Sequence, residues 1–400
     1  MPIAPHNAHT PWHLVALLYT AGLLAALQYA KIAFMLPGLL SESAMSAVQQ
    51  AWVLSIIGIV GAVAGTFAGA VCQAVGLRRT LVWGLAVGVA GAALPLLASH
   101  YAMLLMARVV ESVAHMAIVV AVPTLILSVC ADKDRPKVMV VWSCYFTVTF
   151  ILAALTLPHV LDATGWRGIA LLHAGLMLVV GVLCFGVPRA VVQHSSVDVS
   201  GTSLLHAQWR LLRHGKLLAV PATFFGYTLL FVALVSVLPK LMGQSPQAVA
   251  ALAMALPVAS LVGTLLALGA LGQGITGHRL VRLSAAALVL VGLGLLFTVP
   301  PGLLAHGLVL LCFVLLGTLP AGIVSSIPVL FQPDDADITL VNGGLVQFGN
   351  LGNFVGSPIL AAMLLQFGWV SIGAYVLLGA LVVSICLIFL RTYAASAHSE

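Results

Sequence analysis

The sequence predicts an all-α membrane protein with twelve transmembrane helices. Hydrophobic residues make up 62% of the 400 residues and charged residues only 6%, whereas about a quarter of the residues of a soluble domain are charged. The apolar residues gather into twelve runs, each longer than the roughly 17 residues that a helix needs to cross a bilayer. Alternating strands of about ten residues, typical of membrane β-barrels, do not occur in the sequence. These observations indicate a helical bundle.

A window of about 19 residues, broken at polar, glycine or proline residues, locates the runs. They cover residues 14–38, 47–71, 80–98, 103–128, 138–161, 167–187, 217–239, 248–271, 280–299, 303–330, 341–365 and 370–390. The residues before the first run lack the charged segment of a cleavable signal, and the run itself is long enough to span. We therefore expect the first helix to be retained.

The basic residues predict the orientation. Twelve crossings place both termini on one side of the membrane, and 12 of the 16 lysines and arginines lie in or next to the connections on that side. Only Arg167 and Lys240 fall on the other side. The positive-inside rule therefore predicts cytoplasmic termini. Topology thus accounts for the net charge of +6, and no nucleic-acid partner is expected.

A long polar connection divides the twelve runs into six and six. The predicted organisation is an N-terminal six-helix lobe (12–188), a cytoplasmic linker (189–216) and a C-terminal six-helix lobe (217–391). The end of the linker sets its apolar residues against Arg210 and Arg213, which predicts a short helix lying on the inner leaflet; these apolar residues are Leu204, Leu205, Trp209 and Leu212.

The two halves resemble each other in sequence. With a shift of 200 residues, Gly69, Ala70, Gln73 and Arg79 match Gly269, Ala270, Gln273 and Arg279. The pair Gly165 and Trp166, after the fifth run of the first half, recurs as Gly368 and Trp369 after the fifth run of the second. Internal repetition of six spans is a transporter pattern, so we expect two pseudo-symmetric lobes.

Two segments resemble motifs of the major facilitator superfamily. "GAVCQAVGLRR" is similar to the family's loop after helix 2, with glutamine in place of the usual acid, and "ARVVESVAH" is similar to its helix 4 signature. The resemblance implies two lobes that rock about a central cavity lined by helices 1, 4, 7 and 10. It also implies a conformational role for the loop residues Gly69, Gln73, Gly76, Arg78 and Arg79.

The run at 103–128 carries three ionisable residues, Arg108, Glu111 and His115, on one helical stripe. A charge at the bilayer centre costs at least about 2.5–3.5 kcal/mol, so these side chains are expected to face inward. Lys31 lies at a similar depth in the first run, which predicts a cluster of Lys31, Arg108 and Glu111. The cluster is either a structural ion pair or a substrate and proton site; we favour the second. For His115, a proton path and a packing role both stay open.

The second half offers hydrogen-bonding groups instead of central charges. Tyr227 lies in the seventh run, and Asn350 and Asn353 follow Gln347 at helical spacing in the eleventh. We predict that Tyr227 and the two asparagines contact substrate. For the amides, hydrogen bonds between helices are the alternative.

The sequence contains no pattern of an enzyme active site. The G-x-S-x-G, H-E-x-x-H and P-loop motifs do not occur in it. "GQGITG" follows a membrane helix and not a strand, so it is read as a turn. We therefore expect no enzymatic activity, no cofactor, no metal and no direct use of ATP.

The predicted function is secondary active transport by alternating access. We favour proton-coupled export of a small organic solute such as a drug, metabolite or siderophore, a direction that the resemblance to bacterial twelve-helix members implies. Uptake of a small organic anion by proton symport is the alternative, because the cluster has a net charge of +1. A non-transporting receptor stays open. The expected setting is the bacterial inner membrane, with the lipid bilayer, the solute and protons as partners of a monomer.

Overall fold

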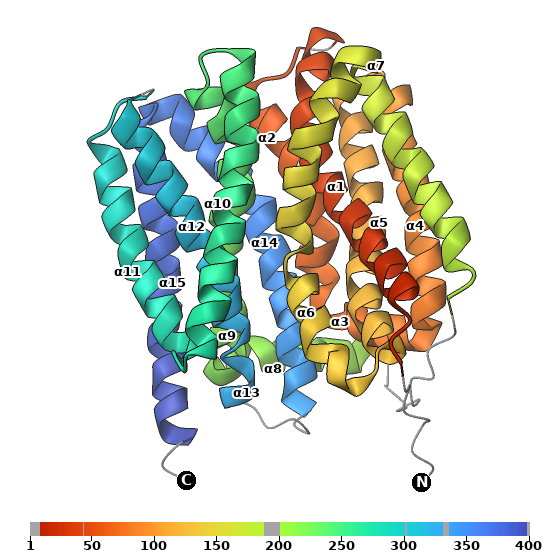
Figure 1. The fold of residues 1–400 in the computed structure, drawn as a ribbon, viewed down its shortest axis with the longest axis vertical. Helices are drawn as coiled ribbons and strands as arrows, with labels where there is room; N and C mark the ends of the chain where they lie inside the picture. Colours follow the sequence, from red (N-terminus) through yellow and green to blue (C-terminus); the bar gives the residue numbers. More distant parts are fainter. Residues whose placement is uncertain (1–8, 43, 188–200, 301, 331–335, 398–400) are drawn as a thin grey trace. The chain divides into compact units, whose positions relative to one another are not determined.

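The computed structural model describes residues 9–42, 44–187, 201–300, 302–330 and 336–397. The regular elements of these segments are all helices, and 11 of them are long and apolar enough to cross a membrane (Figure 1). One of the 11, α7 (Tyr145–Cys184), has 40 residues, or about 60 Å of helix, twice a bilayer core. It bends at Gly165 (φ 68°, ψ −174°). Counted as two arms, α7 completes the twelve predicted crossings.

The helices form two compact units. The first contains Met1–Ala44 and Phe67–Ser200, and the second contains Met45–Thr66 and Gly201–Glu400. The segment 45–66, which holds most of the predicted second span, thus groups with the second unit, although the division at the linker assigns it to the N-terminal lobe. Residues 188–200, at the start of the predicted linker, lie outside the described residues.

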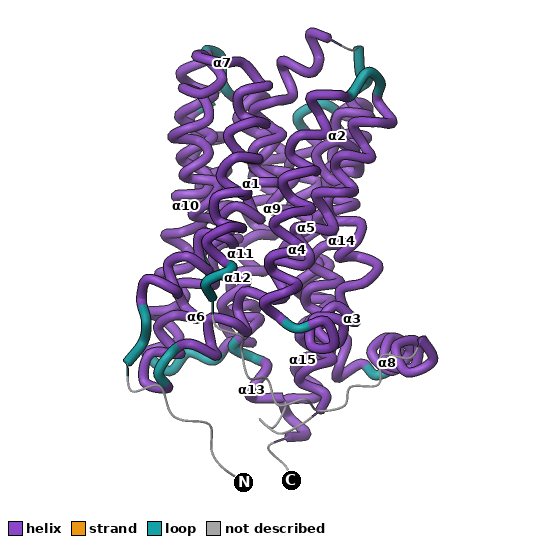
Figure 2. The backbone as a smooth tube through the Cα atoms, turned by 90° about the vertical axis from the view of Figure 1, so that its right-hand side faces the viewer, coloured by secondary structure: helices purple, strands orange, loops and turns teal. Residues whose placement is uncertain are grey.

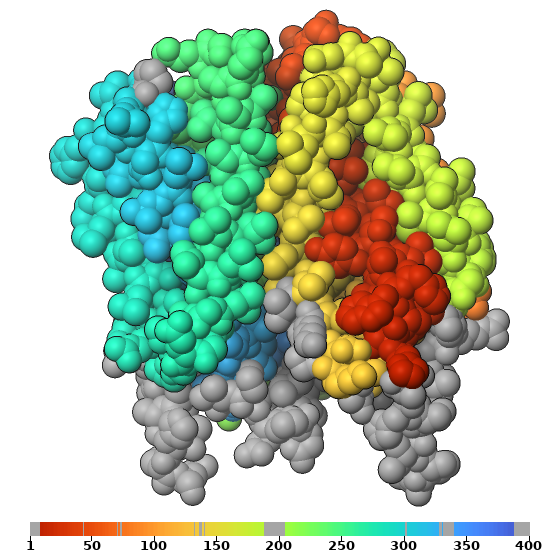
Figure 3. Space-filling model, viewed as in Figure 1, coloured from red at the N-terminus to blue at the C-terminus, as the bar shows by residue number. Residues whose placement is uncertain are grey.

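The first unit is built around α1 (Trp12–Glu42). The side chains of α1 lie between those of the two arms of α7 on the face shown in Figure 3. Thr149 of the first arm donates a hydrogen bond to the Leu23 carbonyl (3.2 Å), and His173 of the second arm donates to the Leu24 carbonyl (3.0 Å). Adjacent turns of α1 are therefore bonded to both arms.

Two further spans complete the centre of this unit, α4 (Leu77–Ala93) and α5 (Tyr101–Val129). Gly84, Gly88 and Gly91 line the face of α4 toward α5 and the second arm of α7: added Cβ atoms at these positions would crowd Ala117, Met177 and Glu111, respectively. Small residues let helix backbones approach closely in a membrane. The short helices η2 (Leu94–Leu97), η3 (Asp132–Asp134) and α6 (Arg135–Ser143) connect the spans.

The second unit surrounds α9 (Gly215–Met242), most of whose residues are buried. Its neighbours are α10 (Pro246–Gly272), α12 (Leu303–Val324), α14 (Ala336–Phe367) and α15 (Val370–Ala397), with α11 (Gly277–Leu296) against α12 and α15. The predicted run 303–330 ends early, because α12 stops at Val324 and the short α13 (Ile327–Leu330) follows.

Three helical pieces of this unit precede the linker in sequence: α2 (Ala47–Ser55), η1 (Ile56–Gly58) and the start of α3 (Ile59–Val75). Their glycines Gly58, Gly61 and Gly65 face α14, where an added Cβ would overlap Asn350 or Gln347. A side-chain hydrogen bond from Thr66 to Gln347 lies at the end of the same stripe. This close approach explains why the segment groups with α14.

The linker ends in α8 (Gly201–Arg213), which runs crosswise to α9 and α14 of its own unit (Figures 1 and 2). Leu211 is fully buried, whereas Leu205, Trp209 and Leu212 are exposed. The Arg213 guanidinium lies 4.3 Å from the centre of the Trp209 ring. The expected amphipathic helix is therefore present; its contact with lipid stays a prediction.

The backbone repeats its turns in the two halves. Among the described residues, φ is positive only at Gly76, Gly165, Gly274 and Gly368. These are two related pairs: the first pair follows the second span of each half, and the second pair follows the fifth span. Glycine is the residue that tolerates such angles, so the repeated G-W sequences correspond to repeated turns.

Candidate functional site

The polar stripe of α5 lies inside the first unit. Arg108 and Glu111 are fully buried and His115 is 5% exposed. Helical spacing places all three on the face that α1 covers. The inward orientation that the sequence predicts is thus observed, and all three side chains contact protein.

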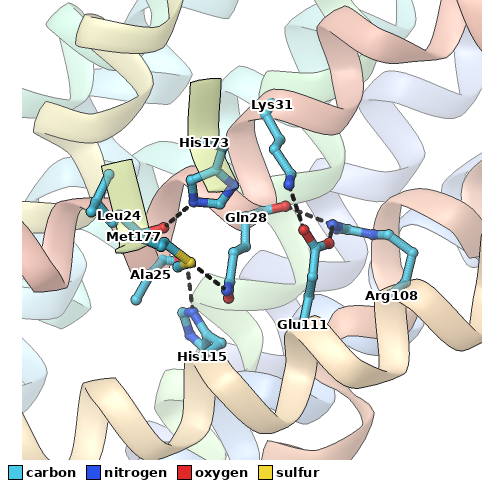
Figure 4. Close-up of polar contacts among 9 residues, drawn as sticks. All are labelled: Leu24, Ala25, Gln28, Lys31, Arg108, Glu111, His115, His173 and Met177. Atoms are coloured by element: carbon cyan, nitrogen blue, oxygen red, sulfur yellow. Dashed lines mark hydrogen bonds and ion pairs between the residues drawn. The ribbon is translucent and has the colours of Figure 1, made fainter. Parts of the chain in front are cut away.

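Glu111 bridges two cations from two helices (Figure 4). Its Oε1 lies 2.5 Å from Nζ of Lys31 on α1, and its Oε2 forms an ion pair with Nη1 of Arg108. The same Nη1 of Arg108 donates to the backbone carbonyl of Gln28 on α1 (2.8 Å). The structure therefore brings together the three residues that similar depths in the sequence predict; their role in binding stays a prediction.

The cluster is buried and carries an excess of positive charge. Lys31 is 1% exposed, and one carboxylate faces two cations, so the net charge with Glu111 ionised is +1. Moving an ion out of water costs several kcal/mol unless a partner compensates it. The arrangement therefore favours an additional anion near the cluster. Because Glu111 is the anionic partner of both cations, its charge determines how well both are stabilised.

α4 packs closely against Glu111 at Gly91. A Cβ added at Gly91 would lie 2.8 Å from Cγ and 3.0 Å from the backbone nitrogen of Glu111. A larger residue at this position would displace either the carboxylate or α5 itself. Gly91 is thus a supporting residue of the cluster that the sequence analysis did not single out.

His115 is held in one orientation by two contacts with α1. Its Nδ1 lies 2.9 Å from the Ala25 carbonyl and therefore donates, because a carbonyl oxygen only accepts. The ring meets Tyr29 edge to face, with 5.0 Å between centres. These contacts are those of a packing histidine. A further role in a proton path stays a prediction.

His173 on the second arm of α7 also belongs to this polar region, and the sequence analysis missed it. It is 1% exposed and lies beside Lys31 (Figure 4). The rule that singles out Lys31, an ionisable residue inside a span, applies equally to His173. It was missed because the resemblance assigns helices 1, 4, 7 and 10 to the cavity, and His173 lies in the sixth.

The predicted residues of the second half lie in the second unit. Tyr227 of α9 is 9% exposed and packs between Phe224 and Phe231, at 5.4 and 5.7 Å between ring centres. Asn350 donates to the carbonyl of Val346 in its own helix (2.8 Å). These contacts hold each side chain on its helix, and a role in substrate binding stays a prediction.

The other two polar residues of α14 differ in burial. Asn353 is half-buried and Gln347 is 9% exposed. Gln347 accepts the hydrogen bond from Thr66, a contact between helices. For Gln347, the interhelical alternative is therefore the one observed.

The predicted conformational loop connects α3 and α4. Gly76 has a φ of 96° and starts α4, and Arg78 donates a hydrogen bond to the carbonyl of Phe185 at the end of α7. Basic side chains commonly bond the last carbonyls of a helix. Arg79 is exposed, Gly69 has open space around it, and the side chain of Gln73 lies outside the described residues. A role of this loop in conformational change stays a prediction.

Comparison with known proteins identifies the family. The sequence profile of the Major Facilitator Superfamily matches residues 18–336, more than half of the chain. The chain belongs to the major facilitator superfamily. A search of curated protein sequences finds no match.

Solved structures of this superfamily share the fold. The D-xylose-proton symporter aligns with a TM-score of 0.73 at 17% identity, covering 92% of this chain and 96% of that protein. The xylose transporter XylE from E. coli, in an inward-open conformation, aligns with a TM-score of 0.72 at 15% identity, covering 92% and 94%. The nucleoside transporter NupG aligns with a TM-score of 0.71 at 14% identity, covering 95% and 99%. Such identities demonstrate the fold and do not identify a substrate.

Family and fold together establish the general function. This superfamily member is a multi-pass integral membrane protein and a secondary transporter, and it is not an enzyme. Within the described residues, no group of three or more histidine, cysteine, aspartate or glutamate side chains is placed to hold a metal ion.

Proposed function

We propose that this transporter moves a small organic solute by alternating access and couples that movement to protons at Glu111. One observation supports the proposal above all: Glu111 is fully buried and its two carboxylate oxygens face different cations on different helices. The charge state of this one carboxylate therefore determines how α1 and α5 interact.

The coupling follows from electrostatics. When Glu111 is ionised, Lys31 and Arg108 share its negative charge. When Glu111 is protonated, neither cation has an anionic partner in the cluster. An uncompensated buried charge costs several kcal/mol, which is large compared with the few kcal/mol that separate conformations of a two-state protein. Protonation of Glu111 would therefore shift the cluster, and α1 with it, toward another arrangement.

Export is the direction we propose, on the resemblance to bacterial twelve-helix members of the family. The alternative is uptake of a small organic anion by proton symport. The net charge of +1 at the cluster favours this alternative, because a carboxylate-bearing solute would supply the missing negative charge. One solved structure with a similar fold is that of a D-xylose-proton symporter. This likeness is compatible with proton-coupled export and with proton-coupled uptake by this chain.

The remaining features of the proposal concern the whole chain. The lobes are 12–188 and 217–391, joined by the linker 189–216, and they rock about a central site. Tyr227, Asn350 and Asn353 supply hydrogen bonds to the solute, and His115 extends the proton path. The protein is a monomer in the bacterial inner membrane with cytoplasmic termini.

Transport in membrane vesicles of both orientations tests direction and substrate class together. An imposed pH gradient should drive accumulation of one class of solute from a panel of drugs, metabolites, siderophores, and carboxylates. Glu111→Gln should abolish the response to the gradient, because the neutral amide cannot release a proton. An unchanged pH response in this variant would reject the proton role of Glu111.

An exposed ion pair in the same unit provides the matched control. Glu42 at the end of α1 accepts from Arg167 at 2.6 and 2.9 Å, but both side chains are largely exposed, at 43% and 56%. Glu42→Gln removes a carboxylate of the same unit that lies outside the cluster, at the end of α1. We expect its pH response to equal that of the wild-type protein.

A further inference from the structure

The ring of His173 has one occupied and one vacant nitrogen. Its Nε2 lies 3.0 Å from the Leu24 carbonyl and therefore carries the proton. Its Nδ1 is then an acceptor, and it is buried without a hydrogen-bond partner among the described residues. Buried polar atoms are nearly always bonded, so a vacant acceptor requires an explanation.

The side chain next to this vacant nitrogen is Lys31. Figure 4 shows the His173 ring with Nε2 turned to Leu24 and the other nitrogen on the edge toward Lys31. The Lys31 ammonium has three donors, and its contact with Oε1 of Glu111 (2.5 Å) occupies one of them.

The other polar side chains drawn near the cluster are already bonded or point away from Lys31. His115 donates to Ala25 and packs on Tyr29. Oε1 of Gln28 is also buried without a hydrogen-bond partner among the described residues, but the Gln28 amide points toward the Met177 sulfur, 3.8 Å from Nε2, and away from Lys31 (Figure 4). From α4, the residue against Glu111 is Gly91, which has no side chain to offer. Among the residues drawn in Figure 4, His173 is therefore the available acceptor for Lys31.

We propose that Nδ1 of His173 is the second hydrogen-bonding position of the Lys31 ammonium, which Lys31 takes up when Glu111 is protonated. The inference rests on the proposed proton coupling at Glu111. A proton enters from water and neutralises the Glu111 carboxylate; Lys31 keeps its three protons and turns from Oε1 of Glu111 to the lone pair of Nδ1. His173 keeps its bond to Leu24. His173 is thus a positioning residue, and the contact links α1 to the second arm of α7.

The charge-assisted hydrogen bond to a neutral imidazole explains how the cluster accepts a proton. Without an acceptor, protonation of Glu111 would leave the ammonium unpartnered in a low-dielectric surrounding, which strongly opposes proton uptake. A hydrogen bond with a charged donor is stronger than one between neutral groups. His173 would therefore make the protonated state accessible and would give it a different helix contact.

Nitrogen-15 NMR of the full-length protein in nanodiscs, labelled at its 13 histidines, tests this contact without any substrate. The Nδ1 resonance of His173 is assigned by its loss in His173→Gln, whose amide can still donate to Leu24. In the wild-type protein at neutral pH, this resonance should be that of a vacant acceptor. In Glu111→Gln, which mimics protonation, it should move upfield as Nδ1 accepts a hydrogen bond.

Two further variants identify the donor. In the double variant Glu111→Gln with Lys31→Met, the resonance should return to the wild-type position. The Nδ1–H of His115, assigned in His115→Asn, should not move in any of these variants. An unmoved His173 resonance in Glu111→Gln, or a shift that persists without Lys31, would overturn the inference. If Glu111→Gln does not fold, acidification of the wild-type protein must produce the same shift.

The outcome is separable from that of the transport experiment. If Glu111→Gln keeps a normal pH response in vesicles, the proposed function fails, whatever the spectrum shows. If transport loses its pH response while the His173 resonance stays in place, only the role of His173 is wrong.

Discussion

Glu111 is held by two cations of different chemistry. The Arg108 guanidinium belongs to the same helix and also donates to the Gln28 carbonyl, whereas the Lys31 ammonium comes from α1 and contacts Oε1 of Glu111. A guanidinium presents a fixed set of donors, and an ammonium on a flexible stem can turn. We therefore expect Lys31 to be the member of the cluster that moves and Arg108 the member that stays in place.

The charge balance predicts an order of stability. Glu111→Gln leaves two buried cations without an anion, a change expected to cost about 3–5 kcal/mol. Lys31→Met leaves one cation and one anion, so its cost should be clearly smaller. Adding Lys31→Met to Glu111→Gln should raise stability above that of Glu111→Gln alone. Thermal unfolding of the purified variants, followed by tryptophan fluorescence, measures the order; equal losses for both single variants would contradict it.

The exposed pair of Glu42 and Arg167 should behave differently. Solvent-exposed ion pairs contribute only about 0–1 kcal/mol, although here the Trp166 indole also donates to Glu42 (3.0 Å). Glu42→Ala should therefore lower the unfolding temperature only slightly. If Glu42→Ala lowered the unfolding temperature as much as Glu111→Gln, burial would not explain why the two ion pairs differ in their contribution to stability.

At the scale of helices, the approach of α4 to α5 determines the position of Glu111. Gly91→Ala should destabilise the protein by about 1–3 kcal/mol, as overpacking does, and should weaken the pH response of transport as well. Gly175→Ala is the matched control, because an added Cβ there meets nothing within 4 Å. Unfolding temperatures and vesicle transport of both variants test this; a neutral Gly91→Ala would show that α5 adjusts freely.

The amphipathic α8 should lie in the lipid headgroup region. Its exposed Leu205, Trp209 and Leu212 share one face, and Trp209 stacks with Arg213, as residues at a membrane interface commonly do. Brominated lipids in nanodiscs should quench part of the tryptophan emission of the wild-type protein. This part of the quenching should be lost in Trp209→Phe. Quenching that is unchanged in this variant would place α8 away from lipid.

At the scale of the molecule, the distribution of basic residues fixes the predicted topology. Arg79→Cys, in the first turn of α4, should react with an impermeant maleimide only in everted vesicles, and Arg167→Cys only in right-side-out vesicles. A background without the six native cysteines is needed for these measurements. Labelling of both positions from the same side would reject the predicted topology.

Native Cys72, at the end of α3, should itself label poorly at neutral pH. Burial raises the pKa of its thiol to about 11, and the thiolate is the reactive form. Labelling of an otherwise cysteine-free variant that retains Cys72 should therefore rise steadily as the pH increases from 7 toward 10. Rapid labelling at pH 7 would mean that the thiol is open to water.

Much of this structure was predictable because bilayer insertion leaves a strong sequence signal. Three features follow from simple properties of the sequence. Length predicts the twelve apolar runs, the φ preference of glycine explains the turns at Gly165 and Gly368, and similar depth predicts the cluster of Lys31, Arg108 and Glu111. The contacts of His173 and Gln347 were not predictable in this way. These contacts depend on which helices are neighbours. The sequence does not reveal the neighbours, because a helix face that meets lipid is as hydrophobic as one that meets another helix.

The sequence by itself predicted twelve helical crossings and a resemblance to the family, since the cost of exposing backbone and charge to hydrocarbon constrains each segment separately. Only the tertiary structure decided that the Glu111 carboxylate bridges two helices, that Gly91 supports it and that His173 keeps a vacant nitrogen beside Lys31. These features arise from close packing between segments distant in the chain. Packing depends on the shapes of facing surfaces and not on the composition of any one helix.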